Sequence, residues 1–199
     1  NSMNEADMIV NGKRTSRVEA ARVAAIEFVN MLEATPDLEF RFSLSLFNGN
    51  GWVAAGFAET SDAILEVLNS PGFINMVGDS TNISDGLFYA EKTFQAINSV
   101  ADHNIGVLIS DGEPVAHHVT VKLEPATQEH KNNRYGYDYI ATESDPSTSL
   151  DGSSLPIKEK VIATDGKTVT FDSVMATESH AYRLKQEGYE IYTIGIHGV

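Results

Sequence analysis

The spacing of apolar residues predicts both helices and strands in the first half of the chain. A helix is predicted over residues 16–33, where a Ser-x-x-Glu capping pattern precedes apolar residues at helical spacing. Residues 39–47 and 52–58 are rich in apolar residues and flank an Asn-Gly turn, which predicts a β-hairpin. Residues 61–70 predict a short helix, and residues 78–100 predict a loop that runs into a helix. This half of the chain is therefore expected to be of mixed α and β structure.

The second half contributes the strands that we expect to be buried. Residues 105–109 form a continuous apolar run closed by Asp111-Gly112, and such a run between helices is typical of a parallel strand covered on both faces. A final helix is predicted from Asp172, with Gly188 as its C-terminal cap, and residues 189–196 predict a closing strand. This order predicts an α/β fold, a doubly wound and mostly parallel sheet flanked by helices. No strand precedes the first helix, although doubly wound folds normally start with one.

Residues 115–171 differ in character from their surroundings. The stretch begins with residues that alternate in polarity, as in an exposed strand. It also contains a Ser/Pro/Gly-rich segment at 143–156, which predicts a loop. It ends in two short runs around Asp165-Gly166, a strong hairpin signal. We therefore predict a β-rich insertion, or arm, over 115–171. The remaining residues, 1–114 and 172–199, form the main domain.

Composition narrows the possible functions. Acidic residues outnumber basic ones 28 to 14, which gives a net charge of -14, so we expect no binding to nucleic acid or to anionic membranes. The chain has no cysteine, which excludes a disulfide-framed module. No apolar run is long enough to span a membrane. No nucleophile elbow, P-loop or dinucleotide fingerprint is present, so we predict that the protein is not an enzyme.

Three separated oxygen donors are expected to meet at one edge of the predicted sheet. Asp111 ends a strand, Thr81 precedes a helix, and Ser2 stands ahead of another helix. The carboxyl edge of an open α/β sheet is where ligands bind. A carboxylate and two hydroxyls are hard ligands, which suit Mg²⁺ best and also Mn²⁺ or Ca²⁺. The residues therefore predict a divalent-cation site made by Ser2, Thr81 and Asp111.

These motifs resemble those of the von Willebrand factor A domain family, which includes the integrin inserted domains. TNISDGL resembles the family's Thr element, VLISDGEP its Asp element, and NSM the end of its first metal-binding element. The likeness extends to the first helix, KRTSRVEAARVAAIEFVNML, and to IYTIGI as a late strand. It covers most of the chain outside 115–171. The resemblance implies a MIDAS metal site with Ser2, Thr81 and Asp111 as ligands.

The family pattern also implies that some parts are absent from this chain. The first strand, which is central in the family's sheet, and the Asp and first Ser of the first element have no counterpart here. The last strand and helix of the pattern are absent as well. We therefore expect a preceding fragment to supply the first strand.

The insertion after the Asp element is similar to the arms of tip adhesins from Gram-positive pili. This resemblance implies a bacterial cell-surface location, in the cell wall or a pilus, with other pilus subunits as partners. It also implies adhesion to a host matrix or cell-surface protein, in which an acidic residue of that protein completes the coordination of the metal.

Other interpretations remain open for each motif. Asp111 can serve as a turn residue, Thr81 as a helix N-cap, and Ser2 as part of a disordered terminus. Asn82-Ile83-Ser84 matches the N-glycosylation pattern, which we treat as a coincidence. Two alternative functions also stand: an intracellular A-domain subunit that assists an ATPase or chelatase complex, and a purely structural pilus domain.

Overall fold

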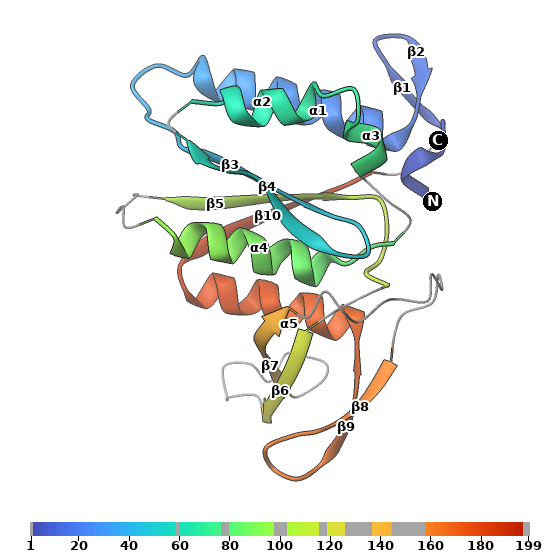
Figure 1. Ribbon diagram of the computed structural model, residues 1–199, viewed down its shortest axis with the longest axis vertical. Helices are drawn as coiled ribbons and strands as arrows, with labels where there is room; N and C mark the ends of the chain where they lie inside the picture. Colours follow the sequence, from blue (N-terminus) through green and yellow to red (C-terminus); the bar gives the residue numbers. More distant parts are fainter. Residues whose placement is uncertain are drawn as a thin grey trace.

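The computed structural model of the chain has layers of helices on both sides of its central strands (Figure 1). It describes residues 2–58, 60–76, 80–97, 103–115, 119–125, 137–144 and 158–196. Helices α1, α2 and α3 lie on one side of strands β3, β4, β5 and β10, and helices α4 and α5 lie on the other (Figure 1). The predicted α/β class is confirmed.

The N-terminal segment leads into the first long helix. The 3₁₀ helix η1 (Ser2–Asn4) is followed by a small antiparallel hairpin of β1 (Met8–Val10) and β2 (Lys13–Thr15). This hairpin was not among the predicted elements, although its turn is an Asn-Gly pair with positive φ at both residues. Helix α1 (Arg17–Glu33) then begins as predicted, because the hydroxyl of its N-cap, Ser16, accepts a hydrogen bond from the backbone N–H of Glu19.

The predicted central hairpin is present. Strand β3 (Phe42–Phe47) pairs antiparallel with β4 (Gly51–Ala58), and α2 (Asp62–Leu68) and the short α3 (Phe73–Met76) follow. A hydrophobic core joins α1, the hairpin, α2 and α3. Its buried members are Val18, Val29, Phe42, Ala55, Ile64, Leu68 and Phe73.

Helix α4 (Ile83–Gln95) packs closely against the opposite face of this hairpin. A Cβ atom built on Gly51 would lie 2.6 Å from the backbone carbon of Asp85, and one on Gly86 would lie 2.6 Å from the ring of Phe47. Both glycines therefore allow a close approach of helix and hairpin that a larger residue would prevent.

A parallel pair forms the other half of the strand layer. Strand β5 (Asn104–Ser110) pairs with β10 (Tyr189–Gly195), with Asn104 opposite Tyr189 and Ser110 opposite Gly195. Helix α5 (Ser173–Gln186) was predicted to begin at Asp172, which is its N-cap, and it precedes β10. Gly188 has the positive φ expected after the end of the helix. Together with α4, it forms a second core, whose buried residues are Ile83, Leu87 and Leu184.

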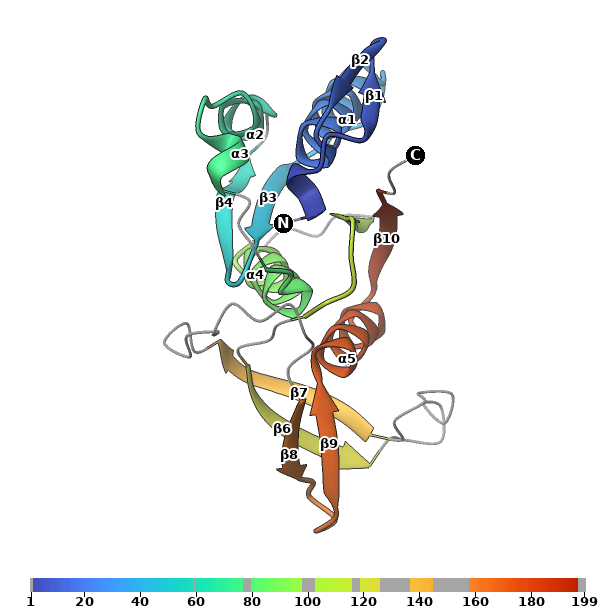
Figure 2. The same ribbon diagram turned by 90° about the vertical axis from the view of Figure 1, so that its right-hand side faces the viewer.

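The strands of segment 115–171 are paired as two hairpins. Strand β6 (Val119–Pro125) pairs with β7 (Tyr137–Ser144), and β8 (Lys158–Ile162) pairs with β9 (Thr168–Asp172) around the predicted Asp-Gly turn. These strands lie on the far side of α4 and α5 from the central strands (Figures 1 and 2). Most of the loop predicted at 143–156 lies outside the described residues. The division into a main domain and an arm stays a prediction.

The predicted continuous sheet is not present in the part of the chain that the structure describes. That part contains five separate two-stranded sheets, and β5–β10 is the parallel pair among them. None of its helices is long and apolar enough to cross a membrane.

Candidate functional site

Asp111 lies where β5 ends, in the position that the sequence predicts. Its side chain is only 2% exposed, and its Oδ2 atom accepts a hydrogen bond of 3.2 Å from the guanidinium of Arg17. A carboxylate this deeply buried needs a cation or several donors, because its charge is otherwise poorly solvated. In this structure Arg17 supplies that positive charge.

Arg17 joins Asp111 to two further carboxylates. Its Nε atom lies 3.0 and 3.1 Å from the two carboxylate oxygens of Asp7, and its NH2 group lies 3.1 Å from Glu5. The hydrogen bond from Arg17 is the main reason that the pKa of Asp7 lies below its ordinary value. The pKa of Arg17 is raised in turn, chiefly by the hydrogen bond to Asp7, so the guanidinium stays charged at any physiological pH.

The loop that carries Thr81 is held from both sides. Asn82, which is fully buried, donates from its side-chain amide to the carbonyl of Gly49 (3.0 Å) and accepts from the backbone N–H of Asp85 (3.1 Å). On the other side, the backbone N–H of Val115 donates to the carbonyl of Thr81 at 2.9 Å. The loop is therefore fixed both to the β3–β4 turn and to the segment after Asp111.

Asn82, and not Thr81, is the N-cap of α4. The alternative interpretation of Thr81 as a helix cap is therefore wrong, and the Thr81 hydroxyl is not used for capping. The burial of Asn82 also agrees with treating the glycosylation pattern as a coincidence, because a folded chain offers no access to its amide.

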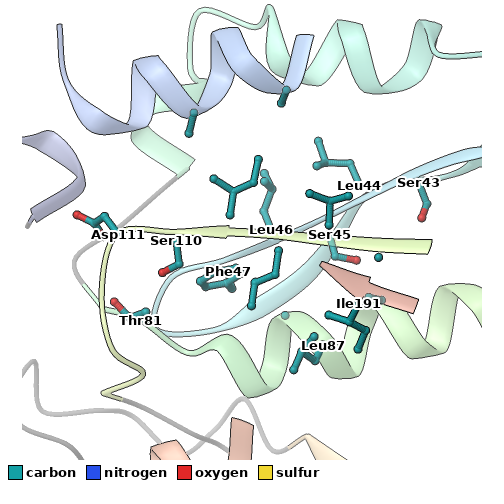
Figure 3. Close-up of a pocket in the computed structure, with 18 of the residues that line it drawn as sticks. Ser43, Leu44, Ser45, Leu46, Phe47, Thr81, Leu87, Ser110, Asp111 and Ile191 are labelled. Carbon is teal, nitrogen blue, oxygen red and sulfur yellow. The ribbon is translucent and has the colours of Figure 1, made fainter. Parts of the chain in front are cut away.

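A cavity of about 280 Å³ lies between β3 and β5, and the three predicted ligands are among the residues that line it. Ser2, Thr81 and Asp111 all line it, with Ser80 and Ser110. Thr81, Ser110 and Asp111 lie at the same end of the cavity, whereas Ser43 lies toward the opposite end (Figure 3). One end of the cavity is thus rich in hydroxyl and carboxylate oxygens.

The chemistry of these donors fits a hard divalent cation. One carboxylate and two or more hydroxyls, completed by water, are oxygen ligands of the type that Mg²⁺ binds. No group of three or more His, Cys, Asp or Glu side chains suited to a metal occurs in the part of the chain that the structure describes. Any cation site at this position would therefore depend on hydroxyls.

Arg17 and Asn82, which position the site, were not among the residues predicted from the sequence. A signal was present for Arg17, because it is the first residue of α1, where the helix dipole disfavours a cation. A cation at that position indicates nearby carboxylates. Asn82 carried a weaker signal, as an Asn directly before a predicted helix.

A second buried polar cluster lies away from the cavity, between α4 and α5. The Nε2 atom of His180, which is fully buried, lies 2.9 Å from the carboxylate of Glu91, and Arg183 also contacts Glu91. Burial lowers the pKa of His180, although the hydrogen bond to Glu91 opposes this shift. Burial opposes ionisation of Glu91 too, but His180 and Arg183 outweigh it, so the pKa of Glu91 lies below its ordinary value. At neutral pH we therefore treat His180 as neutral and Glu91 as ionised.

Comparison with solved structures identifies the type of fold. The chain is similar to the crystal structure of the vWF domain of the type V pili tip protein Mfa5 from Porphyromonas gingivalis, with 16% sequence identity and a TM-score of 0.59. The match covers 90% of this chain and 74% of that chain. This similarity shows a fold like that of von Willebrand factor A domains.

A further match is weaker. The crystal structure of an uncharacterized membrane spanning protein from Vibrio fischeri shares 21% identity, with a TM-score of 0.41 and coverage of 98% of this chain and 86% of that chain. A TM-score at this level supports no conclusion. No protein-family model matches the chain, and no curated protein matches it.

Proposed function

We propose that the protein is a metal-dependent adhesion module of the bacterial cell surface, with a binding role and no catalytic one. The observation that carries the proposal is that Ser2, Thr81 and Asp111, which are far apart in sequence, line one cavity. The similarity of the fold to a pilus tip domain supports a pilus or cell-surface setting with other pilus subunits as partners. The Gram-positive origin expected from the sequence stays a prediction.

Asp111, Thr81 and Ser2 would hold the cation, with Mg²⁺ as the first choice and Mn²⁺ or Ca²⁺ as alternatives. A divalent cation at this position supplies positive charge that attracts a carboxylate of a host matrix or cell-surface protein. The hydroxyls of Ser2 and Thr81 are neutral, so they leave more of that charge available than additional carboxylates would. Arg17 orients the Asp111 carboxylate and balances its charge when no other cation is near.

The proposal is tested by measuring Mg²⁺ and Mn²⁺ binding to the intact chain by calorimetry. Thr81→Val removes the hydroxyl and keeps the side-chain shape, and Asp111→Asn removes the charge. Both are expected to weaken cation binding by about tenfold or more, because each removes a ligand of the cation. A tenfold change corresponds to about 1.4 kcal/mol of binding free energy. Asp165→Asn is the matched control, because Asp165 also precedes a glycine after a strand but lies in the β8–β9 turn.

Unchanged cation binding in both variants, with folding verified by circular dichroism, would remove the proposed site. The same variants then test ligand capture, with a panel of immobilised matrix proteins in Mg²⁺ or in a chelator. A host-protein interaction that survives chelation would contradict the metal-dependent mechanism.

The alternative of a purely structural pilus domain has one observation in its favour. The Arg17–Asp111 ion pair satisfies the carboxylate without a metal. Under this alternative the chain binds no divalent cation in calorimetry, and Arg17→Gln lowers stability without changing cation binding.

A further inference from the structure

Arg17 contacts three carboxylates that are buried to different extents. The side chain of Asp111 is 2% exposed, that of Asp7 is 18% exposed and that of Glu5 is 61% exposed. The guanidinium bonds to all three. These four side chains are called the Arg17 cluster below. One positive and three negative charges give the cluster a formal charge of -2.

The contacts of Arg17 within the cluster are unequal. Toward Asp7 it uses two groups, because Nε lies 3.0 and 3.1 Å from the two carboxylate oxygens and NH2 contacts Oδ2. Toward Asp111 it uses NH1 alone, at 3.2 Å. A two-pronged contact fixes a guanidinium more firmly than a single hydrogen bond does. Asp7 therefore holds Arg17 more strongly than Asp111 does.

Backbone hydrogen bonds keep the rest of the cluster assembled independently of Asp111. The backbone N–H of Arg17 donates to the carbonyl of Glu5 at 3.2 Å, and the N–H of Glu5 donates to the carbonyl of Ser2 at 2.9 Å. The segment before β1 is thus fixed to the start of α1. Arg17 can lose its contact with Asp111 and still keep its bonds to Asp7 in the same place.

A divalent cation and the guanidinium would share the Asp111 carboxylate at a cost. Both are positive, and charges a few ångström apart repel each other more strongly in a partly buried site than in water. A carboxylate already neutralised by Arg17 attracts a cation less than one that is not. The formal charge of -2 on the whole cluster nevertheless equals in size the charge of one divalent cation, so the cluster as a whole attracts it.

We propose that Arg17 competes with the divalent cation for Asp111, and that Asp7 limits this competition by holding the guanidinium when the cation binds. This inference rests on the proposed function, because it concerns the regulation of the same cation site. Arg17 is a positioning residue and not a ligand. It lowers the affinity of the site for the cation, and Asp7 sets how far the affinity is lowered.

Calorimetry with Mg²⁺ and Mn²⁺ on the intact chain tests the sign of the Arg17 effect. Arg17→Gln removes the competing charge and should tighten cation binding by about tenfold or more. Arg17→Lys keeps the charge and should bind the cation no more tightly than the unchanged protein does. If Arg17 only supported the site, Arg17→Gln would weaken cation binding instead.

Arg22→Gln is the matched control for the change in net charge. Arg22 also lies on α1 and is similarly buried, with 22% of its side chain exposed, but it pairs with Glu19 at 2.6 Å. Its substitution should change the cation affinity by less than about twofold, as expected for a charge outside the cluster. A gain as large as that of Arg17→Gln would mean that net charge alone sets the affinity, which would contradict the competition.

Asp7 provides a second test, because it acts through Arg17. Asp7→Asn keeps the side-chain shape but weakens the hold on the guanidinium, and it should lower the cation affinity by about tenfold or more. In the Arg17→Gln background the same substitution should lower it by less than about threefold. Glu5→Gln removes an equal charge from an exposed side chain and should also have an effect of less than about threefold.

The outcomes separate this inference from the proposed function. The expected result is tighter binding by Arg17→Gln that is lost when Asp111→Asn is added, even if the unchanged protein binds too weakly to be detected. Equal or weaker binding by Arg17→Gln, in a protein whose cation binding depends on Asp111, would overturn the competition and leave the cation site in place. No cation binding by either protein would remove both.

Circular dichroism and urea unfolding verify that each variant is folded. If Arg17→Gln does not fold, the comparison of Asp7→Asn with Glu5→Gln still decides, because both variants keep Arg17 and Asp111. Equal cation affinities in these two variants would then contradict the role of Asp7.

Discussion

The β3–β4 and β5–β10 strand pairs, which both line the cavity, are covered to different extents. The β3–β4 hairpin has the α1–α2–α3 core on one face and α4 in close contact on the other. The β5–β10 pair packs on α4 and α5 through Leu108 and Ile191, but its opposite face exposes Ile105, Val107, Tyr192 and Ile194. The hairpin is closed by its own turn, whereas the parallel pair joins distant segments and depends on its neighbours. Within the described residues, the hairpin therefore has both faces covered, whereas the parallel pair has one covered and one exposed face.

The largest difference in the free energy of unfolding is expected between substitutions on the two sides of the β5–β10 pair. Leu184→Ala removes a side chain that is 2% exposed and packs against Ile83 and Leu87, and it should lower the free energy of unfolding by about 2–5 kcal/mol. Ile194→Ala, on the exposed face, should change it by less than about 0.5 kcal/mol. Urea unfolding measures both. A loss at Ile194 as large as that at Leu184 would mean that the outer face is already covered.

A smaller loss is expected where the hairpin meets α4. Gly51→Ala places a methyl group 2.6 Å from the backbone of Asp85, which cannot move without shifting the helix, and should cost about 1–3 kcal/mol. Gly56→Ala on the same strand is the control, because nothing lies within 4 Å of its Cβ position. Similar unfolding curves for the two variants would show that helix and hairpin are packed less closely than the structure indicates.

The next smaller loss of stability is expected for a substitution in the loop between the β3–β4 hairpin and α4. Asn82→Ala removes the N-cap of α4 and the bond to the Gly49 carbonyl, and should destabilise the protein by about 1–2 kcal/mol. The exposed Asn75 provides the control, as Asn75→Ala. Because Asn82 fixes the Thr81 loop, the loss should be accompanied by weaker cation binding. Full stability in the Asn82 variant would leave the position of that loop unexplained.

The smallest expected effect is a pH dependence of stability, which arises from His180 between α4 and α5. Burial lowers the pKa of His180 in the folded protein, so below the ordinary value of 6.5 the unfolded chain binds a proton that the folded one does not. Stability should therefore fall as the pH drops from 7 to 5. The groups that act on His180 are Glu91, Arg183 and Asp85. Protonation of Glu91, whose pKa is also lowered, acts in the same direction at more acidic pH.

His180→Gln should flatten this dependence between pH 7 and 5, measured as thermal unfolding at a series of pH values. His103→Gln is the control, because the side chain of His103 is 72% exposed. A slope that is unchanged by the His180 variant but reduced by the His103 variant would place the titrating group at the surface.

Local patterns predicted the elements well because short-range physics determines them. Three such patterns involve only residues a few positions apart in sequence: the capping pattern at Ser16, the Asp-Gly turn at 165–166 and the glycine at 188. The fold class followed from their order. The continuous sheet did not follow, because pairing of β3 with β5 depends on what lies between them, and no local pattern contains that information.

The candidate site was predicted in the same uneven way. Ser2, Thr81 and Asp111 were found from their places at the ends of elements, and they line one cavity. The contact of Arg17 with Asp111 spans residues far apart in sequence, so it could be anticipated only through the unfavourable cation at the start of a helix. The second interpretation of Thr81, as a cap, failed because its neighbour Asn82 is the better capping residue.

The burial of Asn82 has a practical consequence for producing the protein. A eukaryotic secretory host modifies Asn-x-Ser sites while the chain is still being made, before the fold can hide the amide. A sugar attached to the Nδ2 atom of Asn82 would replace a hydrogen of the amide that donates to the Gly49 carbonyl, and it would not fit around a side chain that is fully buried in the native structure. Recombinant material for every experiment above should therefore come from a bacterial cytoplasm, where this modification does not occur.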